Sequence, residues 1–335
     1  MKDRSLRWLA LIVAVGVLLR LAPLVKNWDH PTIFMDPDSP EYHRIAVNLL
    51  AGHGYSWSEQ PPFEPNIYRP PGLPCLLAVV YALTGASVPH AILLQALLAG
   101  LTIALTYRLA RAVGAEARVA LTAAAVLAVD PVSIYYSNFL LTESYTALVV
   151  VGGALLVMLY RQTGQARHLM GAGALLAVGI LIHPVLLLAP FGLLALPLLA
   201  RATRNLRQLG LAGLAVLIAL APAAAWVARN KVTADYAGIS CVAAVNLLKY
   251  KAASVEAELN GTTREIERDR LTQVCEASLP PGASNGDRWR AWERKGVAIL
   301  LAHPGVYAKV HLRGAALEFF GPDAITSRAS LAGRR

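Results

Sequence analysis

Long hydrophobic runs separated by short polar segments dominate the first 230 residues of this chain. A helix needs about 20 apolar residues to cross ~30 Å of hydrocarbon. Apolar runs predict five spans, at about 8–25, 90–108, 118–130, 140–161 and 209–227. Between residues 161 and 209 the apolar pattern is interrupted at His183-Pro184, which predicts a hairpin of two shorter helices. The pattern therefore predicts about seven transmembrane helices.

The first two spans are separated by a long polar loop, residues 26–89, which contains one further apolar piece. This piece, residues 71–85, is opened by prolines and has 15 residues, too few to cross the hydrocarbon as a helix. Counting it as a span would also reverse the side of every later loop. We therefore expect a juxtamembrane or re-entrant helix that lies against the membrane.

Composition and charge agree with a membrane protein. The chain is 56% hydrophobic and 16% charged, whereas soluble domains average about 25% charged residues. A net charge of +10 would suit nucleic-acid binding, but eleven basic residues lie in four short segments between apolar runs. Basic residues in such segments mark the cytoplasmic side. They place the N-terminus inside and loop 26–89 outside, and they argue against a nucleic-acid partner.

Residues 231–335 have a different character, with 15 basic and 11 acidic residues and no run long enough to span. Helical patterns are expected at 252–278, 287–302 and 304–320. We expect two domains: an all-α membrane module at 1–230 that includes loop 26–89, and an extracytoplasmic helical tail or small domain at 231–335. Cys241 and Cys275 both fall in this tail and would pair only in an oxidising compartment.

The outer loop contains a complete set of helix signals. Ser39 is a suitable N-cap, Pro40 follows at the first helical position, and Gly52 comes after the last periodic residue. Apolar residues recur with helical spacing between them. The stripe consists of Tyr42, Ile45, Ala46, Leu49 and Leu50. This helix would rest its apolar face on the membrane module and place two aspartates at its N-terminal end.

Asp36 and Asp38 allow two interpretations. A carboxylate near a helix N-terminus is stabilised in its charged form by roughly 0.3–1 kcal/mol, which suits a general base. The alternative is that both residues only cap a surface helix. Further along the loop, Arg69 stands before two prolines, where a guanidinium would reach the headgroup level of the membrane. Spacing alone leaves both interpretations open.

Several motifs in order resemble bacterial family 39-type glycosyltransferases, relatives of the protein O-mannosyltransferases and of the lipid A aminoarabinose transferases. The first loop carries D-S-x-x-Y, then A-x-N-L-x-x-G-H-G-Y, then Y-R-P-P-G-x-P. The resemblance continues in N-F-L-L-T-E at 138–143 and P-x-x-x-W-x-x-R-N at 222–230, and covers about residues 6–250. It implies a C-type glycosyltransferase with a seven-helix membrane module.

The same resemblance implies a reaction and a site. Members transfer a sugar from a polyprenyl phosphate to a lipid, glycan or protein acceptor outside the bacterial cytoplasmic membrane, by inverting displacement. Asp38 matches the base, with Asp36 as its neighbour, and Glu143 the acidic residue of the second loop. Arg69 and Arg229 match phosphate contacts. The substrate-binding set is completed by Tyr42, Tyr68, Trp226 and Asn230. No cofactor and no metal ligand is expected, although metal assistance stays open.

Competing interpretations remain. Family members usually carry more membrane helices after the loop that 231–335 resembles, so a compact version, a fragment and half of a split enzyme are all open. A second candidate is a non-catalytic scaffold of the same family, and a third is a transporter or flippase. Transporters need polar groups near the middle of the membrane, whereas most candidates here lie at the outer face. Arg20 is expected either to reach the interface or to pair with an acid such as Glu143.

Overall fold

The computed structural model describes residues 2–192 and 206–320. These residues form helices joined by loops, and the described part contains no strand. The elements are α1 (Lys2–Lys26), η1 (Pro31–Phe34), α2 (Ser39–Leu50), α3 (Gly72–Thr84), α4 (Val88–Ala112), α5 (Ala117–Val129), α6 (Pro131–Ser137), α7 (Glu143–Thr163), α8 (Ala166–Ile182), η2 (Pro184–Leu188), α10 (Leu206–Ala234), α11 (Val242–Val245), the π-helix η4 (Asn246–Ala252), α12 (Ala253–Asn260), α13 (Arg264–Ala277), α14 (Asn285–Ala302) and α15 (Pro304–Phe320). The expected all-α class is confirmed.

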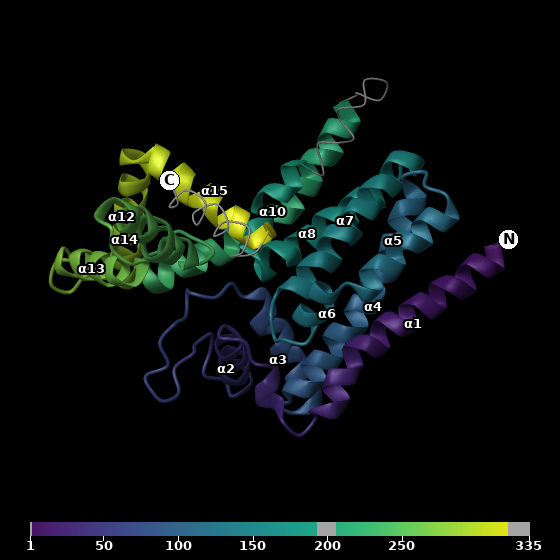
Figure 1. Cartoon of the computed structure of the whole chain (residues 1–335), viewed down its shortest axis with the longest axis horizontal. Coiled ribbons are helices and arrows are strands. Elements are labelled where there is room, and N and C mark those ends of the chain that lie inside the picture. Colours follow the sequence, from purple (N-terminus) through teal and green to yellow (C-terminus); the bar gives the residue numbers. More distant parts are fainter. Residues whose placement is uncertain (1, 193–205, 321–335) are drawn as a thin grey trace, which may run out of the picture. The chain divides into compact units, whose positions relative to one another are not determined.

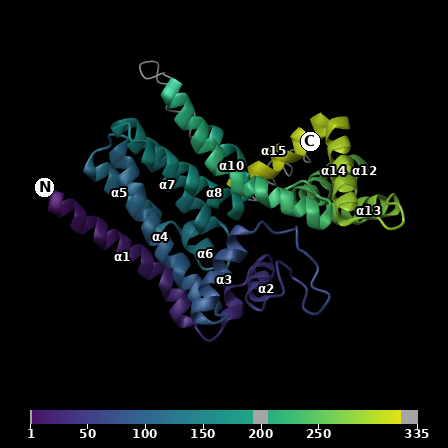
Figure 2. The same cartoon turned by 180° about the vertical axis from the view of Figure 1, so that it is seen from behind.

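The chain divides into two compact units, Met1–Ala228 and Arg229–Arg335. In the first unit α1 packs against α4 and α5, and α7 packs between α4 and α8. Figure 2 shows the same helices from behind, with α4 near the middle of the group. The second unit is built from α11–α15 and η4, in which α14 packs against η4 and α13 against α12.

Among the described residues, fewer helices qualify as membrane spans than the about seven predicted for the whole chain. Four described helices are long and apolar enough to cross a membrane: α1, α4, α7 and α10. The helices α5 and α6 form a fifth candidate, bent by 52° at Asp130-Pro131, where proline removes a backbone donor. Apolar helix α8 has 17 residues and is shorter than a full span. The second helix of the predicted hairpin falls partly on residues 193–205, outside the described residues.

Small residues allow α8 and α10 to approach closely. At Gly173 an added Cβ would lie 2.5 Å from the carbonyl oxygen of Ala215. Around this contact a cluster of buried side chains joins α7, α8 and α10. It consists of Val157, Tyr160, Leu169, Ala172, Ala212 and Ala215. Because lipid is as apolar as these side chains, such close packing is what holds helices together in a membrane.

The predicted amphipathic helix is present as α2, and it packs against α3. Two details of the prediction were wrong. Asp38 rather than Ser39 is the N-cap, and the buried Ser39 hydroxyl accepts a hydrogen bond from the Asp36 backbone at 3.0 Å. Leu50 is exposed, whereas Asn48 is buried because its amide donates to the carbonyls of Ser56 and Ser58. Contacts with the loop at Ser56 and Ser58 therefore bury Asn48 in place of Leu50 in the last turn of α2.

Segment 71–85 forms α3, a 13-residue helix, and its first residue lies against the end of α8. An added Cβ at Gly72 would lie 2.5 Å from the backbone nitrogen of Ile182. Two prolines, Pro70 and Pro71, come directly before Gly72. The helix buries Leu73, Leu77 and Tyr81 in the same core as α2.

We expect Gly72→Ala to destabilise the protein by about 1–3 kcal/mol, because overpacking against backbone cannot be relieved by a rotamer change. Thermal unfolding in detergent measures the effect. Gly213→Ala in α10 is the matched control, since nothing lies within 4 Å of a Cβ at that position. Equal unfolding midpoints for the two variants would contradict the close approach of α3 and α8.

Arg20 does not pair with Glu143. Its side chain is buried, and Nη1 donates to the carbonyls of Gly16 and Ala128 at 2.8 and 2.9 Å. Nη2 donates to the carbonyl of Leu127 and the hydroxyl of Ser133. The bend between α5 and α6 leaves carbonyls without helical partners, so the arginine caps the end of α5 and ties it to α1.

The second unit matches the predicted helical pattern in part. The predicted helix at 252–278 is divided by Gly261, which adopts a positive φ of 65° and separates α12 from α13. The predicted helices at 287–302 and 304–320 are present as α14 and α15, which are separated at His303. Cys241 and Cys275 are both buried and free, so the structure contains no bond between them.

Candidate active site

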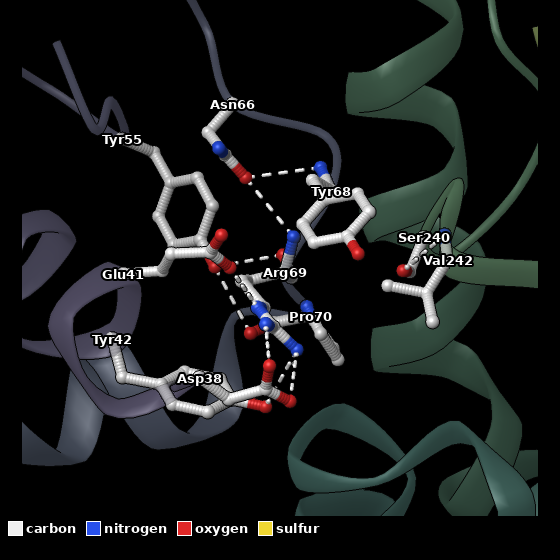
Figure 3. A network of polar contacts seen from close by, with 10 residues as sticks. All are labelled: Asp38, Glu41, Tyr42, Tyr55, Asn66, Tyr68, Arg69, Pro70, Ser240 and Val242. Carbon is white, nitrogen blue, oxygen red and sulfur yellow. Dashed lines mark hydrogen bonds and ion pairs between the residues drawn. The ribbon is translucent and has the colours of Figure 1, made fainter. Parts of the chain in front are cut away.

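Arg69 is the centre of a polar cluster in the first loop (Figure 3). Its Nη2 lies 2.7 Å from Oδ1 of Asp38, and its Nη1 donates to Oδ2 at 3.0 Å. The Nε atom donates to the carboxylate of Glu41. The guanidinium carbon also lies 4.9 Å from the ring centres of Tyr42 and Tyr68. Arg69 therefore holds one carboxylate by a two-pronged contact and a second from the side.

The members of this cluster differ sharply in exposure. The side chain of Arg69 is 7% exposed, that of Glu41 31% and that of Asp38 53%. The buried guanidinium thus fixes the direction of a carboxylate that remains open to solvent. An oriented, accessible carboxylate is what a general base requires, because it must lie within hydrogen-bond reach of the proton that it removes.

The loop backbone around Arg69 is fixed by its own side chains. Oδ1 of Asn66 accepts hydrogen bonds from the backbone amides of Tyr68 and Arg69, each at 3.0 Å. The Tyr55 hydroxyl contacts the carbonyls of Arg69 and Pro70, both at 2.9 Å. The ring of Tyr55 packs edge-on against Trp226 of α10, with the ring centres 4.8 Å apart. Trp226, expected to bind substrate, here supports the residue that holds the Arg69 backbone.

Burial and charge act in opposite directions on the titratable groups of the cluster. Burial raises the pKa of Glu41, although Arg69 lowers it. Burial also raises the pKa of the Tyr42 hydroxyl to about 12. Burial lowers the pKa of Arg69. The hydrogen bond to Asp38 and the nearby Tyr42 and Glu41 raise it by more, so the pKa of Arg69 is raised overall. The arginine is therefore a permanent cation in the cluster.

Asp36 and Glu143 are the other two acidic candidates. Asp36 is half-buried, and its backbone rather than its side chain contacts Ser39. Glu143 is exposed at the first residue of α7. Burial is the largest cause of the raised pKa of the Tyr42 hydroxyl; Arg69 lowers this pKa, and the charges of Asp38 and Glu143 raise it.

The loop before Glu143 is held by a side chain of α4 and by one backbone hydrogen bond to the first loop. The Gln95 amide of α4 donates to the carbonyls of Ser137 and Phe139 at 3.3 and 2.7 Å. The backbone amide of Leu140 donates to the carbonyl of Phe34 at 3.1 Å. Two loops far apart in sequence are therefore fixed to each other beside α2.

Arg229 and Asn230 belong to the second unit. The side chain of Asn230 is fully buried, and its amide donates to the carbonyls of Gly238 and Ile239 at 2.8 and 3.2 Å. Its Oδ1 accepts a hydrogen bond from Nη1 of Arg229 at 2.9 Å. These contacts favour a structural role for Asn230. A phosphate contact by Arg229 stays a prediction.

Sequence reasoning missed three residues of the cluster: Glu41, Tyr55 and Asn66. Glu41 stands three residues after Asp38, and residues at this spacing share a helix face. That spacing was the available signal for a second carboxylate. Tyr55 and Asn66 act through backbone contacts that depend on the loop path, which has no local periodicity. Within the described residues, no group of three or more His, Cys, Asp or Glu side chains is arranged to hold a metal ion.

The fold and this cluster define a class: a multi-pass membrane protein with an oriented carboxylate in a loop at the ends of its helices. Residues 68–229 match the family model described as dolichyl-phosphate-mannose-protein mannosyltransferase. This match supports a mannosyltransferase-like membrane glycosyltransferase of the family 39 type. Arg69, Glu143 and Trp226 fall inside the matched stretch, whereas Asp38 precedes it. No curated protein matches the chain.

Proposed function

We propose that this protein transfers a sugar from a polyprenyl-phosphate donor to an acceptor on the extracytoplasmic side of a bacterial cytoplasmic membrane. The matched family, whose description names a dolichyl phosphate mannose donor and a protein acceptor, supports a lipid-linked donor. The distribution of basic residues supports an outward-facing loop 26–89. The proposed acceptor is a protein, a lipid or a glycan.

The observation that carries this proposal is the paired geometry of Asp38 and Arg69. A carboxylate that is half-exposed and held at both oxygens by a buried guanidinium has a fixed direction. Catalysis gains from such positioning, because a reacting group held in place avoids the entropy cost of finding its orientation. A helix that only needed a cap would not require a buried arginine behind it.

In the proposed reaction, Asp38 accepts the proton of the acceptor hydroxyl. The acceptor oxygen attacks the anomeric carbon as the bond to the lipid phosphate breaks, so configuration at that carbon inverts. The electron pair of the broken bond leaves with the polyprenyl phosphate. Because the phosphate gains negative charge in this step, a guanidinium near it would stabilise the transition state more than the ground state.

The contacts of Arg69 support a role other than the phosphate contact that the resemblance implied. Its guanidinium is already engaged by two carboxylates and two aromatic rings. We therefore propose that Arg69 orients Asp38 and Glu41, and that a different cation meets the phosphate. Arg229 stays the candidate for that contact.

The full chain reconstituted in liposomes, supplied with polyprenyl-phosphate mannose carrying a radiolabel in the sugar, tests the proposal. We expect label to move to an acceptor added on the side of loop 26–89, with the product inverted at the anomeric carbon by NMR. Retention of configuration would overturn the direct displacement. If no label moves to peptide, lipid or glycan acceptors and the donor does not bind, the scaffold interpretation replaces the enzyme.

A further inference from the structure

The first unit contains a cavity whose lining residues lie outside the Arg69 cluster. It has a volume of 740 Å³ and is formed by the N-terminal part of α1 and the ends of α4, α5 and α7. Figure 1 shows these ends together, opposite the end of the unit that carries α2. Its walls are largely aliphatic. They include Leu6, Leu9, Leu155 and Leu159.

One rim of this cavity is basic. Arg108 and Arg111 lie three residues apart on α4, so they share one helix face. Both are exposed, and neither forms an ion pair with any described residue. Nη1 of Arg111 donates to the carbonyl of Ala115 at 2.7 Å, which holds this side chain at the turn between α4 and α5. The cavity thus combines an apolar interior with an unneutralised cationic rim.

A second groove on the other side of α1 repeats this arrangement. It has a volume of 570 Å³ and contains Arg4 and Arg118 beside the apolar residues Trp8, Ile12 and Leu121. Tryptophan prefers the level of the headgroups in a membrane. The four arginines and Trp8 therefore mark one headgroup level at this end of the helices.

We propose that the cavity between α1, α4 and α7 binds an anionic phospholipid. The lipid belongs to the membrane leaflet at the end of the helices that carries these arginines. Its acyl chains would fill the aliphatic walls, and its phosphate would contact Arg108 and Arg111. Basic pockets between transmembrane helices recognise anionic headgroups in this way, and the guanidinium fork matches phosphate geometry. The occupant is a membrane lipid rather than free phosphate because most of the cavity wall is apolar.

Native mass spectrometry of the purified full chain in zwitterionic detergent tests the site. We expect dioleoylphosphatidylglycerol to be retained in preference to dioleoylphosphatidylcholine. The double variant Arg108→Gln/Arg111→Gln should weaken this retention roughly 25-fold, or about fivefold for each arginine. Arg167→Gln is the matched control, since Arg167 is an exposed arginine on α8 that lines neither cavity.

A second variant keeps the charges and fills the space. Leu159→Trp should reduce phosphatidylglycerol retention while leaving the thermal unfolding midpoint in phosphatidylcholine nanodiscs unchanged. Equal retention of the two lipids, or an equal loss in Arg167→Gln and the double variant, would overturn the proposal. Displacement of phosphatidylglycerol by inorganic phosphate alone, or by equimolar polyprenyl phosphate, would also overturn it, in favour of a simple anion site or a site for the donor chain.

Discussion

Asp38→Asn is expected to lower the rate of sugar transfer by about 10²–10⁴-fold, the usual contribution of a general base. A carboxamide has nearly the same shape as the carboxylate but cannot accept the acceptor's proton. Asp38 is half-exposed, so the substitution should leave expression and membrane insertion close to the wild-type level. Initial rates with saturating donor, measured beside the amount of protein in the membrane, give the comparison.

Asp36→Asn is the control for this variant, because Asp36 lies two residues earlier in the same loop and its side chain is not part of the Arg69 cluster. We expect it to retain most of the wild-type rate. The opposite pattern, with Asp36→Asn inactive and Asp38→Asn active, would show that the wrong aspartate has been assigned as the base.

Arg69→Ala is expected to lower both the transfer rate and the stability. Without the guanidinium, Asp38 loses its two-pronged contact, and misplacement of a catalytic group by about 1 Å can cost 10²-fold in rate. Loss of one partner of a buried pair can cost 3–5 kcal/mol. Because the carboxylates are 53% and 31% exposed, we expect about 1–3 kcal/mol here. Arg69→Lys should restore stability more than rate, since an ammonium lacks the fork.

Arg44→Ala, on α2, is the matched control, because Arg44 is another arginine of the first loop that pairs with a carboxylate. Arg44 pairs with Glu59 at 2.7 Å, and the two side chains are 41% and 74% exposed. Exposed pairs typically contribute less than about 1 kcal/mol, so neither rate nor stability should change much. Similar losses in Arg44→Ala and Arg69→Ala would contradict the positioning role of Arg69.

The stability loss in Arg69→Ala should also depend on pH through Glu41. Arg69 lowers a pKa that burial raises, so its removal should raise the pKa of Glu41 further. A raised pKa in the folded state favours the protonated form, which stabilises the fold at low pH and ceases to do so as pH rises through that pKa. The stability of Arg69→Ala should therefore be closest to that of the wild type near pH ~4, and its loss of stability should be largest at neutral pH. Thermal unfolding midpoints of both proteins across this pH range measure the difference.

The local signals in the sequence were sufficient for the class of protein and for α2. Apolar runs and basic connections need no tertiary information, because the membrane itself imposes the length of a span and the side on which arginines remain. Motifs in the first loop were sufficient to identify Asp38 and Arg69 as candidates. A sequence pattern predicts the positions of residues that interact only with their own helix or with the bilayer.

Tertiary structure decided what each candidate contacts. The resemblance implied a phosphate contact for Arg69, which stays a prediction, and the sequence left Arg20 either at the interface or beside an acid. In the structure Arg69 holds Asp38 and Glu41, and Arg20 caps the end of α5. Both outcomes depend on partners 28 or more residues away. A buried guanidinium forms hydrogen bonds with the acceptors that the fold places near it, because a buried donor without a partner costs free energy. This cost is larger than the energy of local conformational preferences. No local spacing encodes that choice.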